Sequence, residues 1–194
     1  EKYANNPTKF VEGLYRVGIG EPLDLDIPGY QPPIIRYPNK QNWWKTTLAW
    51  MSIGYETQIA PINTLAFYNA IANNGKMVKP RFVKAIMRDG AVVEEFEPIV
   101  LKESICSSEA LKKMQDMLEG VVSKGLGKQA GSPQFHVSGK TGTAQVAQGA
   151  GGYKGGTMQY LVSFCGYFPS EDPKYSCIVA IRKPGYPASG GGMA

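Results

Sequence analysis

Three extended segments in the C-terminal part of the sequence place the strongest constraint on the fold. Residues 160–168 and 175–182 are the most apolar stretches of the chain, and a short polar segment joins them. Two apolar runs of this length, separated by a turn signal, are typical of adjacent antiparallel strands. Residues 137–145 precede them and are also predicted to be extended. We therefore expect the three segments to form one antiparallel sheet.

Helical signals occur in three other parts of the sequence. Asn6-Pro7 is a typical helix start, and Asn74-Gly75 is a typical helix stop. Apolar residues recur at helical spacing in the predicted helices at 7–17, 61–73 and 108–124. Either Ser107 or Ser108 is expected to cap the last of these. The sequence therefore predicts an α+β fold, in which an antiparallel sheet is flanked by helices.

A hairpin is predicted in the middle of the chain. Asp89-Gly90 lies between two stretches with strand character, 82–88 and 91–96. An Asp-Gly pair favours a two-residue turn because both positions can adopt left-handed backbone angles.

The composition is that of an ordinary globular protein. The 194 residues are 43% hydrophobic and 19% charged, enough for one domain with a sizeable core. The net charge of +5 comes from scattered lysines and arginines, so no nucleic-acid partner is implied. No apolar run approaches the roughly 18 residues of a membrane span. The sequence opens with polar residues rather than with methionine or a signal peptide, and we expect it to be a piece of a longer protein.

The cysteines and the histidine do not form a metal-binding or disulfide pattern. Cys106, Cys165 and Cys177 are odd in number and include no Cys-x-x-Cys spacing. Cys165 and Cys177 could be neighbours across a hairpin, but such residues are more often buried apolar side chains than a disulfide. The single histidine, His136, is expected to be structural.

The most reactive group of residues is Lys140-Thr141-Gly142-Thr143. If this segment is a strand, Lys140 and Gly142 share one face and the two threonines share the other. Gly142 would let a substrate backbone come close. A lysine beside hydroxyls and backbone N–H groups suits a carboxylate or an oxyanion. The plain alternative is a polar turn with a solvated lysine.

A nucleotide-binding alternative fits the sequence less well. Gly139-Lys140-Thr141 matches the end of a phosphate-binding P-loop, but that motif needs a glycine where Gln134 stands and a helix that starts at the lysine. Gly142 argues against an immediate helix.

The order of motifs along the chain resembles the penicillin-binding proteins, in which a Lys-Thr-Gly strand edges the active site. Residues 17–30 read VGIGEPLDLDIPGY, and residues 52–75 read SIGYETQIAPINTLAFYNAIANNG. Both are similar to segments of that family. The Tyr55-Glu56 pair looks closer to division-type transpeptidases than to elongation-type ones.

The sequence departs from the family pattern at two places. Ala60 stands where the family has a threonine before the proline, and the lost helix cap is worth about 1 kcal/mol. Gly125-Leu126-Gly127 stands where the family has Gly-Thr-Gly.

The resemblance implies that residues 1–194 are one partial domain, the C-terminal portion of a class B transpeptidase with the fold of penicillin-binding proteins and β-lactamases. Members of the family cross-link peptidoglycan stem peptides through an acyl-serine intermediate, bind β-lactams, and need no cofactor or metal. Lys140 is the implied catalytic residue, and it also attracts the substrate carboxylate. Thr141, Gly142 and Thr143 are implied to bind substrate, with the Thr143 backbone N–H as an oxyanion donor. The Gly-rich loop at 147–157 is implied to overhang the cleft.

The two other family motifs, Ser-x-x-Lys with the nucleophile and Ser-x-Asn, do not occur in the sequence. The resemblance therefore implies that this piece is inactive alone. It also leaves two hypotheses: part of an active transpeptidase, or a non-catalytic binding or scaffold module that keeps the fold. Without the rest of the domain, some faces should be exposed, which predicts association or marginal stability.

Partners and location follow from the same resemblance. The expected ligands are D-Ala-D-Ala stem peptides and β-lactams. The expected protein partners are the division or elongation machinery of the full-length form. The expected location is the bacterial cell envelope, at the extracytoplasmic face of the plasma membrane, with no membrane segment in this piece.

Overall fold

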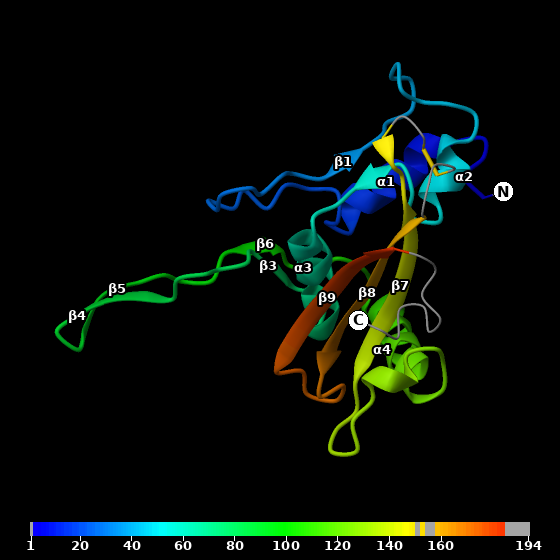
Figure 1. The fold of residues 1–194 in the computed structure, drawn as a ribbon. Coiled ribbons are helices and arrows are strands. Elements are labelled where there is room, and N and C mark those ends of the chain that lie inside the picture. The colour runs from blue at the N-terminus through cyan, green and yellow to red at the C-terminus, as the bar shows by residue number, and fades with distance from the viewer. Residues whose placement is uncertain (1, 150–151, 154–157, 185–194) are drawn as a thin grey trace. The chain divides into compact units, whose positions relative to one another are not determined.

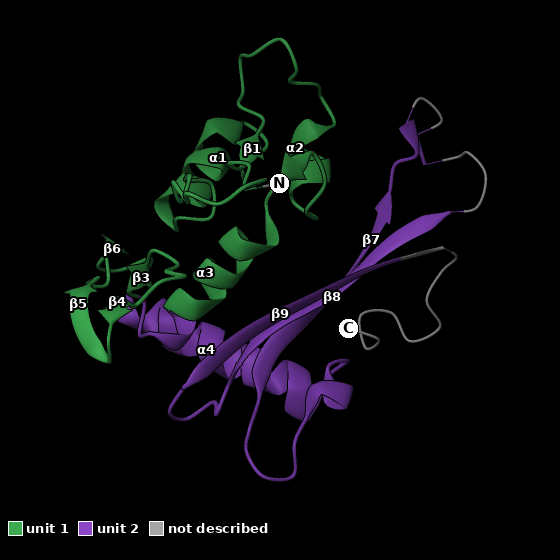
Figure 2. Ribbon diagram, turned by 60° about the vertical axis from the view of Figure 1, so that its left-hand side comes forward, with its two compact units in different colours: residues 1–70, 76–106 green, residues 71–75, 107–194 purple. Residues whose placement is uncertain are grey.

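A computed structural model describes residues 2–149, 152–153 and 158–184. The chain divides into two compact units (Figure 2), residues 1–70 with 76–106 and residues 71–75 with 107–194. Each unit has its own helices and strands. The expectation of a single partial domain over 1–194 remains a prediction.

The helices and strands follow the chain in the order drawn in Figure 1. The first unit contains α1 (Pro7–Arg16), β1 (Ile34–Ile35), α2 (Thr47–Met51), β2 (Thr57–Gln58), most of α3 (Pro61–Ala72), β3 (Met77–Val78), β4 (Ala85–Arg88), β5 (Ala91–Glu95) and β6 (Val100–Lys102). The second contains the end of α3, α4 (Ser108–Ser123), the short 3₁₀ helix η1 (Lys128–Ala130), β7 (Ser138–Val146), β8 (Gln159–Phe168) and β9 (Tyr175–Pro184). The predicted α+β class is confirmed.

The core of the first unit forms around α1. The Asn6 side chain accepts a hydrogen bond from the Lys9 backbone N–H at 3.3 Å and Pro7 is the first helical residue, as predicted. The helix buries Val11 completely. Val11 lies in a cluster with Ile35 and Met51, which brings the apolar face of α1 together with β1 and α2.

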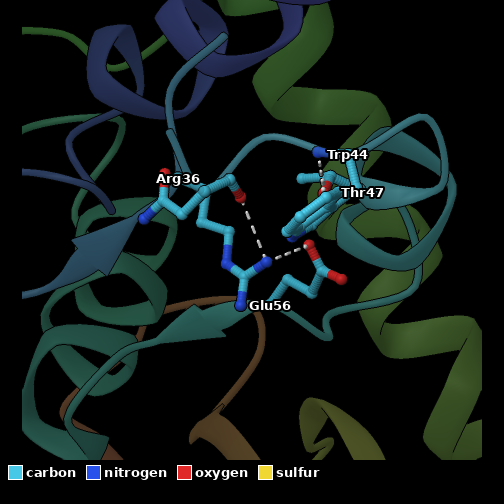
Figure 3. Close-up of polar contacts among 5 residues, drawn as sticks. Arg36, Trp44, Thr47 and Glu56 are labelled. Carbon is cyan, nitrogen blue, oxygen red and sulfur yellow. Dashed lines mark hydrogen bonds and ion pairs between the residues drawn. The ribbon is translucent and has the colours of Figure 1, made fainter. Parts of the chain in front are cut away.

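The Pro-rich segment after α1 is held by polar contacts as well as by packing (Figure 3). Arg36 Nη1 donates to Glu56 Oε2 at 3.1 Å and to the carbonyl oxygen of Asn42 at 3.2 Å. The Trp44 backbone N–H donates to Thr47 Oγ1 at 3.1 Å, and Thr47 is fully buried. Arg36 therefore joins the end of β1, the following loop and the residue before β2. The ion pair is shielded, because the two side chains are only 32% and 20% exposed.

The middle helix and the hairpin match the sequence predictions. α3 ends at Ala72. The predicted stop residues Asn74 and Gly75 follow it and both have positive φ, 51° and 88°. β4 and β5 pair antiparallel across Asp89 and Gly90, whose φ angles are 51° and 81°. Two successive positive φ angles are the geometry that an Asp-Gly hairpin turn requires.

The second unit is built on a three-stranded antiparallel sheet in the order β7-β8-β9. This is the sheet that the three extended segments predict. α4 lies against β7 and buries Leu111, Leu118 and Val122. Of the two candidate caps, Ser107 is the one used: its side chain accepts a hydrogen bond from the Ala110 N–H at 3.3 Å.

The two cysteines of this sheet lie on neighbouring strands but on opposite faces. Cys165 pairs with Ile178, while Cys177 pairs with Gly166. Because paired residues share a face and adjacent residues alternate, the one-residue offset separates the thiols. Both thiols are free, as expected. Cys165 is buried, which confirms the expected buried apolar role, but Cys177 is exposed, so the same expectation is wrong for Cys177.

Candidate active site

The Lys140–Thr143 segment lies inside a continuous strand. β7 runs from Ser138 to Val146, and every residue of it has a partner on β8. Lys140 pairs with Cys165 and Thr141 with Phe164, so lysine and threonine occupy opposite faces as predicted. Because Lys140 lies within a strand, no helix starts at this residue. The P-loop alternative needs such a helix and is therefore wrong.

β7 is an edge strand. Within the described residues it pairs with β8 only, so alternate backbone N–H and C=O groups along its other edge have no strand partner there. An edge of this kind offers a row of donors and acceptors to an extended ligand. Lys140 and Thr143 are exposed, and Thr141 is partly buried.

The Lys140 ammonium group is available to an anion. Its Nζ donates to the carbonyl oxygen of Thr141 at 2.7 Å. No carboxylate forms an ion pair with it among the described residues. A single contact to a neighbouring carbonyl leaves two of its three N–H donors uncommitted. A substrate carboxylate would meet a cation that has no competing counter-charge in this part of the structure.

Gly142 has a structural reason to lack a side chain. A Cβ at this position would lie 2.6 Å from the Ser163 hydroxyl oxygen on β8. Ser163 pairs with Gly142 and therefore shares the face of Lys140. The space beside Gly142 is thus taken by this hydroxyl. The idea that Gly142 admits a substrate backbone remains a prediction.

A second glycine contact lies next to the motif and is not among the sequence predictions. Gly139 pairs with Gly166, and a Cβ on Gly139 would clash with the Phe164 ring and with the carbonyl oxygen of Cys165. The ring therefore packs over two cross-strand glycines. Glycines inside strands are a known sign of close approach, and this signal could have identified the contact.

His136 makes its contacts at the end of the sheet where β7 begins, just before Ser138. Its Nδ1 contacts a carboxylate oxygen of Glu171, in the turn between β8 and β9, and lies 3.9 Å from Glu119 Oε1 on α4. Its carbonyl oxygen accepts a hydrogen bond from the Ser170 N–H at 3.0 Å. These contacts join α4, the start of β7 and the turn, and they are structural in kind.

The described residues hold no group of three or more histidine, cysteine or acidic side chains suited to a metal ion. The predicted Gly-rich loop at 147–157 falls largely on residues 150–151 and 154–157, which lie outside the described residues. At its near end, the Gln145 side chain donates to the Tyr153 carbonyl at 2.9 Å.

Lys-Thr-Gly is one of the motifs of class A β-lactamases and penicillin-binding proteins, and here it lies on the edge strand β7. A family model described as the penicillin binding protein transpeptidase domain matches residues 2–194. The chain belongs to this family.

Relatives and solved structures agree with the assignment. Penicillin-binding protein PbpB of Mycolicibacterium smegmatis is 29% identical over 95% of this chain and 29% of its own length. The probable peptidoglycan D,D-transpeptidase PbpC of Pseudomonas aeruginosa is 31% identical over 92% of this chain and 29% of its own length. Penicillin-binding protein 3 of Mycobacterium tuberculosis, solved with ampicillin, matches with a TM-score of 0.76 and 28% identity, over 91% of this chain and 40% of the solved one.

The chain therefore spans less than a third of the length of these two relatives. The chain covers a larger share, 52%, of the solved transpeptidase domain of Burkholderia pseudomallei penicillin-binding protein 3, and the two structures match with a TM-score of 0.71. The resemblance to penicillin-binding proteins predicted from the motifs is confirmed, as is the partial transpeptidase fold.

Proposed function

We propose that the chain is part of a peptidoglycan D,D-transpeptidase that cross-links cell-wall stem peptides and binds β-lactams. The observation that carries the proposal is Lys140, which is exposed on an edge strand within an intact Lys-Thr-Gly-Thr motif and has no ion-pair partner among the described residues. The names of relatives support it, since several are called peptidoglycan D,D-transpeptidases or homologues of FtsI. One family model spans both compact units, which favours a single partial transpeptidase domain.

The reaction assigned to the full-length protein is acyl transfer through a serine. The serine hydroxyl attacks the carbonyl carbon of the penultimate D-alanine, an ester forms, and the peptide bond to the last D-alanine breaks. An amine of a neighbouring strand then attacks the ester, and the serine regains its proton. The sequence contains no Ser-x-x-Lys, so the nucleophile must come from outside these 194 residues and this piece alone is inactive.

The residues of β7 then have separate roles. Lys140 attracts the terminal carboxylate of the substrate and assists proton transfer, because its ammonium group has no counter-charge among the described residues. The hydroxyls of Thr141 and Thr143 bind the same carboxylate or its equivalent in a β-lactam. The backbone N–H of Thr143 supplies one oxyanion donor. Gly142 leaves room for the Ser163 hydroxyl, which a Cβ at this position would approach to 2.6 Å.

The wider role follows the relatives. A place in cell division is supported by the FtsI-type names, and the division machinery is the corresponding protein partner. The site of action is the bacterial cell envelope, outside the plasma membrane, where the full-length form is anchored. None of the described helices has the length and apolar character needed to cross a membrane.

Labelling by a fluorescent penicillin tests the proposal. The 194-residue chain should remain unlabelled, while the same protein extended upstream should form a covalent adduct. In the extended protein, Lys140→Ala should lower the acylation rate by about 10²-fold or more, the range of lost acid–base assistance. Lys128→Ala, at an exposed lysine of η1, is the matched control and should acylate normally.

Two results would contradict the proposal. If the extended protein is not labelled, the protein is a binding or scaffold module that keeps the fold. If Lys140→Ala acylates at the normal rate while thermal unfolding shows an intact fold, Lys140 has no part in the chemistry.

A further inference from the structure

The first unit contains a concave pocket whose lining includes none of the residues proposed for the transpeptidase reaction. It has a volume of about 670 Å³ and lies between the segment before α1, the start of α1, and α2. This is within the range of roughly 300–1,000 Å³ typical of small-molecule sites. The side chains that matter for recognition are Lys2, Tyr3, Phe10, Trp43, Lys45 and Ser52.

The aromatic part of the pocket is fixed by the core of the unit. Phe10 and Trp43 pack against the buried cluster of Val11, Ile35 and Met51. The Tyr3 ring meets the Phe10 ring edge to face, with centroids 5.6 Å apart and planes at 63°. Rings held in this way can contact a flat apolar group with little loss of side-chain freedom.

The polar part of the pocket is cationic. Lys2 and Lys45 line it, and no lining residue is acidic. In the part of the chain that the structure describes, neither lysine forms an ion pair. Lys2 Nζ lies 5.6 Å from the centroid of the Tyr3 ring. The Ser52 hydroxyl already donates to the Ala49 carbonyl at 2.7 Å, and the two ammonium groups are the charged donors of the lining.

We propose that this pocket binds a small amphipathic carboxylate, a molecule with a flat apolar ring system and one carboxylate group. The ring system would lie against Tyr3, Phe10 and Trp43, and the carboxylate would accept hydrogen bonds from Lys45 and Lys2. Charged hydrogen bonds to an ammonium group favour an anion over a neutral compound of the same shape. All lining residues belong to one unit, so the inference does not rest on the proposed transpeptidase activity.

The test compares two probes that differ only in charge. Naphthalene-1-acetate and naphthalene-1-acetamide are titrated into the chain and into the protein extended upstream, and binding is followed by calorimetry and by chemical shifts of the tryptophan indole N–H groups. The acid should bind with a Kd on the order of 1 mM, typical of a small fragment in an open pocket. The amide should bind several-fold more weakly, and the difference should shrink at high salt because exposed charges are screened.

Three substitutions separate the two parts of the pocket. Lys45→Gln should weaken the acid by roughly threefold to fivefold, the range of an exposed ion pair, and should leave the amide unchanged. Lys84→Gln removes the same charge from the exposed β4–β5 region of the same unit and should change neither. Tyr3→Ala should weaken both probes alike, because it removes ring contact rather than charge.

Several outcomes overturn the inference. Equal affinity for acid and amide would remove the role of the lysines, as would an equal effect of Lys45→Gln and Lys84→Gln. Absence of saturable binding up to about 10 mM would show that the pocket binds no such compound. Binding by the 194-residue chain but not by the extended protein would show that preceding chain fills the pocket.

Discussion

At the scale of single residues, the two glycines of β7 should differ in how well they tolerate a methyl group. At Gly142 the added Cβ meets the Ser163 hydroxyl, which can rotate away. At Gly139 it meets the Phe164 ring and the backbone carbonyl of Cys165, and the backbone cannot move without disturbing the sheet. Overpacking typically costs about 1–3 kcal/mol, so we expect Gly142→Ala near the lower end and Gly139→Ala near or above the upper end.

Urea unfolding of the single variants measures this difference. The double variant Gly142→Ala/Ser163→Ala is the control, because the serine Cβ would lie at an ordinary 3.9 Å from the new methyl group. It should recover most of the stability lost in Gly142→Ala. Equal losses at the two glycines, or no recovery in the double variant, would show that the sheet relaxes in another way.

A second residue-scale prediction concerns Cys165. Burial, with a smaller effect of nearby Cys177, raises the pKa of the Cys165 thiol from 9.0 to about 12. Between these values the unfolded chain releases the proton and the folded chain keeps it. The stabilising contribution is therefore complete below about pH 9 and is lost as the pH rises toward 12.

The free energy of unfolding should accordingly fall more steeply above pH 9 in the wild-type chain than in Cys165→Ala. Denaturant midpoints measured between about pH 8 and about pH 11 give the two slopes. Cys177→Ala, at an exposed thiol, should keep a slope near that of wild type. Parallel curves for wild type and Cys165→Ala would exclude the raised pKa.

Independently, a thiol reagent should modify Cys177 long before Cys165 in the folded chain.

At the scale of elements, substitutions at the starts of α3 and α4 should change the free energy of unfolding in opposite directions. Ser107 caps α4 through its hydroxyl, whereas α3 begins after Ala60, which has no side-chain acceptor. Since a serine or threonine cap is worth about 1 kcal/mol, Ser107→Ala should lower the free energy of unfolding by about that amount. Ala60→Thr should raise it by a similar amount.

Chemical denaturation of both variants checks the prediction, and circular dichroism should show unchanged helix content in the folded state. Ser108→Ala is the matched control, because Ser108 is the first residue of α4 and not its cap. A loss in Ser108→Ala as large as that in Ser107→Ala would mean that the hydroxyl of Ser107 is not the stabilising group.

The elements that the sequence predicts are those whose signals are local. Asn6 and Pro7 start α1, Asp89 and Gly90 turn the hairpin, and alternation within 137–145 places Lys140 opposite in face to Thr141. The four two- or three-residue strands of the first unit were not predicted, nor was the short helix α2. Such short elements carry no periodic pattern, and packing of distant residues determines them.

The contacts of the candidate site could be predicted only in part, for a similar reason. The motif identified Lys140 and its neighbours because their chemistry is visible in four consecutive residues. The contacts between Gly142 and Ser163, and between Gly139 and Phe164, depend on the register of β7 with β8. A shift of one residue would place different side chains opposite each other, and the sequence between the strands does not determine that register.

At the scale of the whole molecule, apolar side chains remain exposed in both units. On the sheet, Val179 and Ile181 of β9 are each 39% exposed and share a face. On the hairpin, Val92 and Val93 are each 57% exposed. A two-stranded hairpin is marginally stable alone in water, and exposed apolar patches favour association. The relatives are more than three times as long as the matched segment, so we expect further chain to cover part of this surface.

The last prediction is that the 194-residue chain self-associates more strongly than the protein extended upstream. Sedimentation velocity over a range of concentrations measures the association, and binding of an apolar dye reports the exposed surface. Val179→Thr/Ile181→Thr keeps β-branched residues on the strand while it removes apolar area, and it should reduce association if the sheet face is responsible. Val92→Thr/Val93→Thr is the matched pair for the hairpin.

Whichever pair lowers association identifies the face that the longer protein covers, since a covered face cannot also drive self-association. A chain that sediments as a monomer at every concentration, like the extended protein, would contradict the expectation that either face needs a cover.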